Sequence, residues 1–178
     1  GRNTAIQGIS DLDMIFQLPY SVYEQYNNYS GNGQSALLNA VKTSIEKTYS
    51  TTSIRADGHV ILVPFNDGIT FEVAPAFINK DDSFTYPDSN NGGRWRTTNP
   101  KPEIEAIRAR NAVCNGNLIL LCRMMRSWKN KWNVPIGGLL IDTLAYQFIE
   151  SYTYRDKSYL YYDFFCRDFF KWMAEQDE

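Results

Sequence analysis

Two strand-like runs around a tight turn signal constrain the fold of this chain more than any other feature. Residues 59–65 and 69–77 flank Asn66-Asp67-Gly68, a sequence typical of a β-hairpin turn. In the second run every other residue is apolar, and successive side chains of a strand point to opposite faces. We therefore predict a hairpin in which Glu72 lies on the face opposite the apolar one.

The rest of the chain changes from strand-like to helical patterns near residue 93. Strands are predicted at 12–18 and 52–57, and a helix at 35–48, with loops at 27–33 and 78–93. Beyond that point strand signals mostly stop, and helices are predicted at 103–132 (with a weak point at 115–117), 139–151 and about 157–175. The predicted fold class is α+β, a mixed sheet in residues 1–100 followed by a helical lobe in residues 101–178.

Composition limits the class of protein. A chain of 178 residues with 43% hydrophobic and 15% aromatic residues is expected to be globular rather than disordered. No apolar run approaches the roughly 20 residues of a membrane helix, and no signal peptide is visible. Cys114, Cys122 and Cys166 are interpreted as buried, reduced thiols of a cytoplasmic protein, and His59 as a structural residue.

Charge is distributed unevenly along the chain. Residues 94–131 carry 9 basic and 2 acidic residues, a net charge of +7, whereas the flanking segments carry net charges of −5 and −4. Such a segment favours an element that faces a polyanion. A solvated helix face is an equally weighted alternative.

Asp11 and Asp13 stand two residues apart at the start of the 12–18 run, so they would project from the same face of a strand. Carboxylates that converge from neighbouring strands repel each other unless cations compensate. Magnesium ions suit such oxygen ligands, and two of them could clamp a phosphoryl transfer. The alternative is that Asp11 caps a turn, Asp13 is exposed at an edge and Glu72 is solvated.

These residues resemble a known family. "TAIQGISDLDMIF" is similar to the metal-binding signature of polymerase-beta-like nucleotidyltransferases, and "GITFEVAPAFIN" to the later strand with the third acid. "GGRWRTTNP" and "LLCRMMRSWKNKW" resemble the bacterial SMODS-type branch, which is related to cyclic GMP-AMP synthase and oligoadenylate synthase. The resemblance covers nearly the whole chain and implies the nucleotidyltransferase fold with its helical lobe.

The resemblance also implies roles for individual residues. Asp11, Asp13 and Glu72 would be the catalytic residues and bind two Mg²⁺ ions, with Mn²⁺ as an alternative; most relatives have Asp at the third position. Arg126 stands where relatives have a Lys that contacts the triphosphate. Lys129, on a neighbouring turn, and Ser10, in the Gly8-Ile9-Ser10 turn, are further candidate nucleotide contacts.

Two other segments have structural interpretations. Trp95, Arg96 and Asn99-Pro100 are expected to anchor a loop and cap the next helix. The aromatic run at 159–172 is expected to form core or a partner face rather than a base-stacking surface.

The family's Gly-Ser turn, which holds the triphosphate, is not evident, because Gly1-Arg2 is too close to Asp11 and lacks the serine. We therefore expect that this turn stands upstream and that the chain is a fragment also truncated at its C-terminus. A fragment of this kind can be inactive by itself.

The implied activity is synthesis of a cyclic di- or trinucleotide, or a short oligonucleotide, from nucleoside triphosphates with release of pyrophosphate, as a second messenger in anti-phage defence. The alternatives are a nucleotidyltransferase that modifies a protein, a tRNA or a small molecule, and a non-catalytic nucleotide- or RNA-binding module. Expected partners are nucleoside triphosphates and, as candidate activator, a regulatory protein or nucleic acid, with no membrane association.

Overall fold

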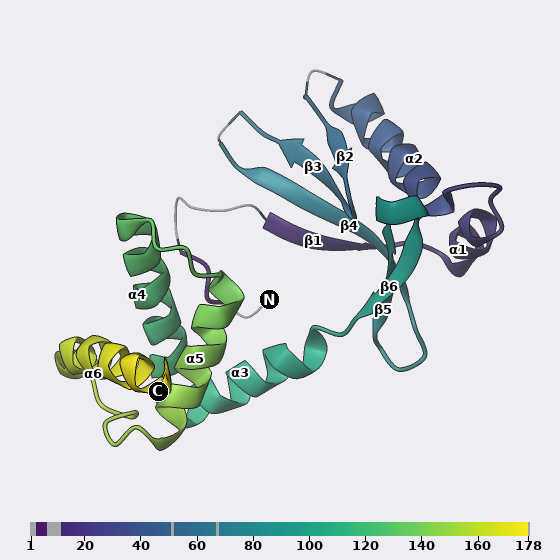
Figure 1. Cartoon of the computed structure of the whole chain (residues 1–178). Helices are drawn as coiled ribbons and strands as arrows, with labels where there is room; N and C mark the ends of the chain where they lie inside the picture. Colours follow the sequence, from purple (N-terminus) through teal and green to yellow (C-terminus); the bar gives the residue numbers. More distant parts are fainter. Residues whose placement is uncertain (1–2, 7–11, 51, 67, 178) are drawn as a thin grey trace. The chain divides into compact units, whose positions relative to one another are not determined.

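The computed structural model describes residues 3–6, 12–50, 52–66 and 68–177 (Figure 1). The chain divides into two compact units. The sheet unit is Ser10–Pro100, and the helical unit combines Gly1–Ile9 with Lys101–Glu178. The described N-terminal residues 3–6 thus belong to the helical unit, although they precede the first strand.

The sheet unit is built on a six-stranded mixed sheet. Its strands are β1 (Leu12–Gln17), β2 (Arg55–Asp57), β3 (Val60–Pro64), β4 (Thr70–Ile78), β5 (Phe84–Asp88) and β6 (Arg94–Thr98). The order is β2-β3-β4-β5-β6 with antiparallel pairs, and β1 pairs with β4 in parallel. The mixed sheet confirms the predicted α+β class.

The predicted hairpin is confirmed. Strands β3 and β4 pair antiparallel, with Leu62 opposite Glu72. The turn is closed by the Phe65 N–H, which donates to the Ile69 carbonyl at 2.8 Å, and by the Gly68 N–H, which donates to the Phe65 carbonyl at 3.1 Å. Gly68 has φ of +84°, a conformation that glycine adopts without the steric penalty of a side chain.

Helix α2 (Gly33–Thr48) covers one face of this sheet (Figure 1). Its Leu38 packs with Ile61, Val63 and Val73 of β3 and β4 and with Ile54. Asn32 caps the helix, since its side-chain oxygen accepts a hydrogen bond from the Ser35 N–H at 2.9 Å. The predicted helix at 35–48 is therefore confirmed and begins two residues earlier.

Four features of the sheet unit differ from the prediction. The loop expected at 78–93 contains β5 and a short 3₁₀ helix, η1 (Asn90–Gly92), and a further strand, β6, follows it. Helix α1 (Tyr20–Asn27) was not predicted, and β2 covers only half of the run at 52–57. Strand β5 pairs with the end of β4, and β6 pairs with β5. The polar sequences of these two strands do not signal this arrangement.

The aromatic side chain of Trp95 ties α1 to the sheet. Its ring centroid lies 4.9 Å from that of Tyr23 and 5.7 Å from that of Phe77. Its indole N–H donates to the Asn27 side-chain oxygen at 3.0 Å. Trp95 therefore anchors α1 to the sheet, and an anchoring role was expected for this residue.

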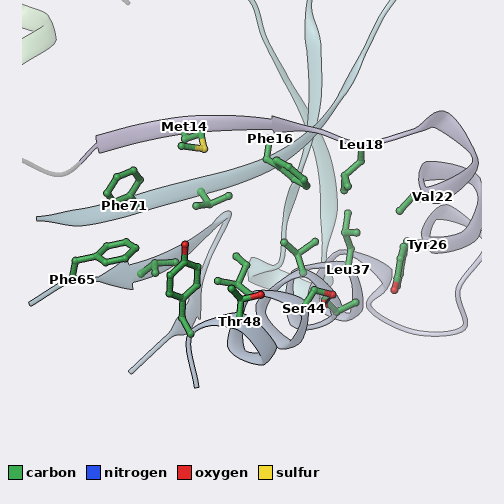
Figure 2. Close-up of a pocket in the computed structure, with 16 residues that line it drawn as sticks. Met14, Phe16, Leu18, Val22, Tyr26, Leu37, Ser44, Thr48, Phe65 and Phe71 are labelled. Atoms are coloured by element: carbon green, nitrogen blue, oxygen red, sulfur yellow. Dashed lines mark hydrogen bonds between the residues drawn. The ribbon is translucent and has the colours of Figure 1, made fainter. Parts of the chain in front are cut away.

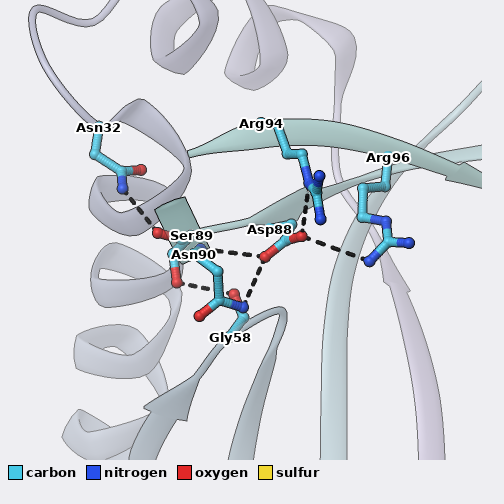
Figure 3. Close-up of polar contacts among 7 residues, drawn as sticks. All are labelled: Asn32, Gly58, Asp88, Ser89, Asn90, Arg94 and Arg96. Carbon is cyan, nitrogen blue, oxygen red and sulfur yellow. Dashed lines mark hydrogen bonds and ion pairs between the residues drawn. The ribbon is translucent and has the colours of Figure 1, made fainter. Parts of the chain in front are cut away.

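A buried carboxylate, Asp88, organises the end of β5 (Figure 3). Its Oδ1 accepts hydrogen bonds from the backbone and side-chain N–H groups of Asn90, at 3.1 and 2.9 Å. Its Oδ2 accepts one from Arg94 Nε at 3.0 Å, and Arg96 Nη1 lies 3.5 Å away. Asp88 is 2% exposed, so these partners replace the water that a buried carboxylate loses.

The neighbouring Ser89 connects this network to the rest of the sheet unit. Its N–H and hydroxyl both donate to the Gly58 carbonyl in the β2–β3 turn, at 2.8 and 2.9 Å. Its carbonyl accepts from the Asn32 side chain at 2.9 Å (Figure 3). The Asp88 network therefore joins the start of α2, the β2–β3 turn and β6.

We expect the Asp88 network to make the stability of the sheet unit depend on pH. The Asn90 backbone N–H and then Arg94 hold the pKa of the Asp88 carboxyl below its ordinary value of 3.8. A depressed pKa stabilises the fold above the ordinary value, and this contribution is lost as the pH falls through the folded-state pKa. Asp88→Asn should therefore lower the urea midpoint at pH 7, and the deficit should shrink below pH 3.8.

Urea denaturation of the wild type and of Asp88→Asn at stepwise lower pH measures this. Asp57→Asn, at an exposed carboxylate of β2, is the matched control and should follow the wild type. A deficit of equal size at neutral and acidic pH would contradict the electrostatic origin.

The helical unit contains α3 (Lys101–Val113), α4 (Asn117–Trp132), α5 (Gly138–Ser151) and α6 (Tyr162–Ala174). The short 3₁₀ helices η2 (Tyr159–Tyr161) and η3 (Glu175–Asp177) flank α6. Its core is formed by α3 to α6 around Leu121, Phe148, Phe165 and Phe169. The aromatic run at 159–172 thus contributes core residues, as the sequence indicated.

The weak point predicted at 115–117 is a complete break between two helices. Asn115 and Gly116 have φ of +53° and +81°, which no α-helix accommodates. The side chain of Asn117, 2% exposed, then donates to the carbonyls of Arg155 and Lys157 at 2.9 and 2.8 Å. The start of α4 is thereby fixed to the α5–α6 connection.

The cysteines are free thiols, with Cys114 and Cys122 buried and Cys166 partly buried. Burial raises the pKa of Cys114 and Cys166, which disfavours the reactive thiolate. His59 is exposed in the β2–β3 turn, where its ring faces Tyr86 at 6.0 Å. Among the described helices, none combines the length and apolar character needed to cross a membrane.

Candidate active site

The parallel pairing of β1 with β4 brings two predicted acids together. Asp13 and Glu72 are register partners, flanked by the pairs Leu12–Phe71 and Met14–Val73. Because register partners of neighbouring strands point to the same face, Asp13 and Glu72 share one face of the sheet. Asp13 is exposed and Glu72 partly buried. Asp11 and Ser10, also predicted for this site, lie outside the described residues.

The opposite face of the same strands carries an apolar pocket of about 680 Å³ (Figure 2). Met14 and Phe16 of β1 and Phe71 of β4 point into it, toward α2. Among the described side chains that line it, only those of Tyr26, Ser44, Thr48 and Tyr49 carry a polar group. This lining does not suit a triphosphate, and the alternation along β1 therefore separates an apolar face from the acidic one.

The donor set on the acidic face fits a hard cation. Two carboxylates on adjacent strands provide oxygen ligands of the kind that Mg²⁺ prefers. Within the described ranges, no group of three or more His, Cys, Asp or Glu side chains is placed to hold a metal ion. The described part of the site is thus the pair Asp13 and Glu72, and Asp11 remains a predicted third ligand.

The other two predicted contacts, Arg126 and Lys129, lie on α4 in the helical unit. The Arg126 guanidinium makes a two-point ion pair with Asp142 of α5. Lys129 is partly buried in the last turn of α4, where a cation also interacts favourably with the helix dipole. Both remain predicted phosphate contacts.

The +7 segment is not a single basic surface, because it belongs to both units. Four of its arginines form ion pairs with acids: Arg94 and Arg96 with Asp88, Arg110 with Glu150, and Arg126 with Asp142. Arg123 donates instead to the Asn3 carbonyl and side-chain oxygen, at 3.2 and 2.9 Å. The net charge of +7 counted from the sequence is therefore larger than the positive charge that a polyanion could contact.

Asp88 and Asp142 are the two most buried carboxylates among the described residues, and neither was predicted to have a role. Asp142 interrupts the apolar stretch from Gly138 to Ile149, and such an acid requires a buried partner. That signal was present in the sequence. Asp88 follows Pro87 in a polar segment that reads as a loop, so nothing local marked it as buried.

Comparison with known proteins decides the family. The family model described as "Second Messenger Oligonucleotide or Dinucleotide Synthetase domain" (SMODS) matches residues 1–111. This chain belongs to the SMODS family. The resemblance read from the sequence is thereby confirmed.

Individual SMODS relatives agree with this assignment. A probable cyclic nucleotide synthase of Bacillus cereus (strain VD146) is 22% identical over 182 residues, covering 86% of this chain and 54% of the relative. The chain therefore spans about half of that protein.

Two solved structures share the fold. CdnE cyclic dinucleotide synthase of Elizabethkingia meningoseptica, with GTP and Apcpp, matches with a TM-score of 0.62 at 16% identity, covering 87% of this chain and 63% of that one. CdnE c-UMP-AMP synthase of Rhodothermus marinus, with Apcpp and Upnpp, matches with a TM-score of 0.59 at 18% identity and the same coverage. These matches confirm the nucleotidyltransferase fold predicted from the sequence.

Proposed function

We propose that the protein containing this sequence joins nucleoside triphosphates into a cyclic di- or trinucleotide, or a short oligonucleotide, and releases pyrophosphate. The observation that carries the proposal is the in-register pair of Asp13 and Glu72 on neighbouring strands of a SMODS chain. The SMODS description and the nucleotides in the CdnE structures support this substrate class.

Asp13 and Glu72, with Asp11, would hold two Mg²⁺ ions, or Mn²⁺ in their place. Two carboxylates side by side on one face repel each other, and bound cations remove that repulsion. Metal ions in such a site neutralise charge on a triphosphate and polarise its phosphoryl groups. Glu72 would also help to activate the attacking ribose hydroxyl, and its side chain reaches one methylene further than aspartate.

The remaining predicted residues would bind the nucleotide. Arg126 presents a guanidinium, whose planar set of donors matches phosphate oxygens. Lys129 on the same helix and Ser10 before the acids complete the proposed contacts. We further propose that the product is a second messenger of cytoplasmic anti-phage signalling and that a regulatory protein or nucleic acid activates synthesis.

Mass analysis of reaction products tests the proposal. The protein is incubated with the four nucleoside triphosphates and Mg²⁺ or Mn²⁺, with EDTA as the metal-free arm. We expect a cyclic or short linear oligonucleotide and pyrophosphate only when metal is present. A nucleotide attached to a protein, tRNA or small molecule would support transfer to an acceptor instead. Nucleotide binding that is unaffected by the metal ion and yields no product would support a non-catalytic binding module.

A further inference from the structure

Arg126 and Asp142 form an ion pair with fixed geometry inside the helical unit. Arg126 Nε donates to Asp142 Oδ1 at 3.0 Å, and Nη2 donates to Oδ2 at 2.8 Å. The Asp142 side chain is 1% exposed and that of Arg126 is 21% exposed. The carboxylate is therefore buried, while about a fifth of the Arg126 side chain remains exposed.

Asp142 is itself fixed by a second partner. The Thr4 hydroxyl donates to Asp142 Oδ2 at 2.8 Å, and Thr4 is 4% exposed. With both oxygens engaged, the carboxylate has little freedom to rotate. The Asp142 carboxylate is therefore a rigid acceptor, and its two hydrogen bonds fix the orientation of the Arg126 guanidinium.

Gly138, the first residue of α5, makes room for this guanidinium. A Cβ at position 138 would lie 2.5 Å from Arg126 Nη1 and 2.9 Å from both Cζ and Nη2. These distances are well inside van der Waals contact, so any other residue would displace the guanidinium. At the preceding Gly137, by contrast, a Cβ would meet nothing within 4 Å.

We propose that Asp142 and Gly138 are positioning residues that hold Arg126 ready for a phosphate group of the nucleotide, an inference that rests on the proposed function. The two-point contact uses one N–H of Nε and one of Nη2, and an arginine has five such donors. Nη1 takes no part in this two-point contact, and its N–H groups are the donors that we assign to phosphate oxygens. Because the side chain is ordered in advance, binding does not have to restrict it.

Isothermal titration of the 178-residue chain with inorganic tripolyphosphate tests the positioning role. Gly138→Ala keeps every charge and displaces only the guanidinium, and it should weaken binding about tenfold. Gly137→Ala is the matched control and should bind as the wild type does. Asp142→Asn should weaken binding to a similar extent, with circular dichroism to verify that each variant is folded.

A double-mutant cycle adds a measurement that a purely structural role would not change. A lysine has no planar fork to align on Asp142. In an Arg126→Lys background, Asp142→Asn and Gly138→Ala should therefore have less than a twofold effect on tripolyphosphate binding. The coupling between positions 126 and 142 in binding then measures the positioning directly.

The outcomes separate this inference from the proposed function. If Arg126→Ala abolishes tripolyphosphate binding but Gly138→Ala and Asp142→Asn do not weaken it, the positioning role is overturned and the phosphate contact stands. If Asp142→Asn tightens binding, Asp142 competes with phosphate, and the inference is again overturned. If the wild type does not bind, or Arg126→Ala binds equally well, the phosphate contact of Arg126 fails and the inference fails with it.

Discussion

Replacing Asp13 by asparagine is expected to reduce oligonucleotide synthesis by about 1,000-fold, which corresponds to roughly 4 kcal/mol of transition-state stabilisation. The substitution keeps the size of the side chain and removes one charged metal ligand. Metal ions in a two-ion site stabilise the developing charge by several kcal/mol, so an incomplete ligand set should lower the rate steeply. Product formation with saturating nucleoside triphosphates and Mg²⁺ measures the effect.

The position of Asp13 allows a clean control. It lies on β1, where all six residues are exposed, so the asparagine variant should be at least as resistant to urea as the wild type, since the substitution also removes the repulsion with Glu72. Asp57→Asn, on an exposed part of β2 in the same sheet, changes the net charge equally and should leave synthesis unchanged. Equal activity of Asp13→Asn and the wild type would remove Asp13 from the proposed metal site.

Glu72→Gln should also reduce oligonucleotide synthesis steeply, because it removes the second described carboxylate of the proposed metal site. Glu72 is partly buried on β4, opposite Asp13 in register. If the two side chains share metal ions, raising the Mg²⁺ or Mn²⁺ concentration should partly restore both variants. This rescue distinguishes a metal ligand from a residue that binds nucleotide alone, for which added metal would have no effect.

The acidic face could be predicted from the sequence because its determinants are local. The alternation of apolar and polar residues places Glu72 opposite Phe71 and Val73, and the Asn66-Asp67-Gly68 turn sets the hairpin. The pairing of β1 with β4 is not local, because 52 residues separate Gln17 from Thr70. The sequence analysis only supposed that the acids converge from neighbouring strands, and the register shows that this pairing brings Asp13 beside Glu72.

The parts that sequence analysis missed depend on distant partners. Strand β6 exists because Arg94 to Thr98 pair with β5, and α1 is held by Tyr23 against Phe77 and Trp95. Neither segment has a periodicity strong enough to signal its structure. The same reason applies to charge: counting arginines in 94–131 could not show which of them would meet Asp88, Asp142 or Glu150.

Removing the charge of Arg126 is expected to destabilise the helical unit by about 3–5 kcal/mol. Arg126→Met keeps an unbranched apolar side chain but leaves Asp142, 1% exposed, without its cation. Asp142 keeps the hydrogen bond from the Thr4 hydroxyl, but a buried carboxylate that loses its cation still keeps much of the penalty of its burial, which is the origin of this magnitude. Chemical denaturation followed by tryptophan fluorescence measures the loss, because Trp128 packs against Phe170 and Trp172 against Phe148 in this unit.

Two further variants identify the cause of this loss. In Arg126→Met combined with Asp142→Leu the buried charge is gone, so most of the stability should return. Glu150→Gln interrupts the ion pair with Arg110 at a carboxylate that is 60% exposed, and exposed pairs contribute only about 0–1 kcal/mol. A loss in Arg126→Met no larger than that of Glu150→Gln would mean that water or another group compensates Asp142, and the pair could not then hold Arg126 in a fixed orientation.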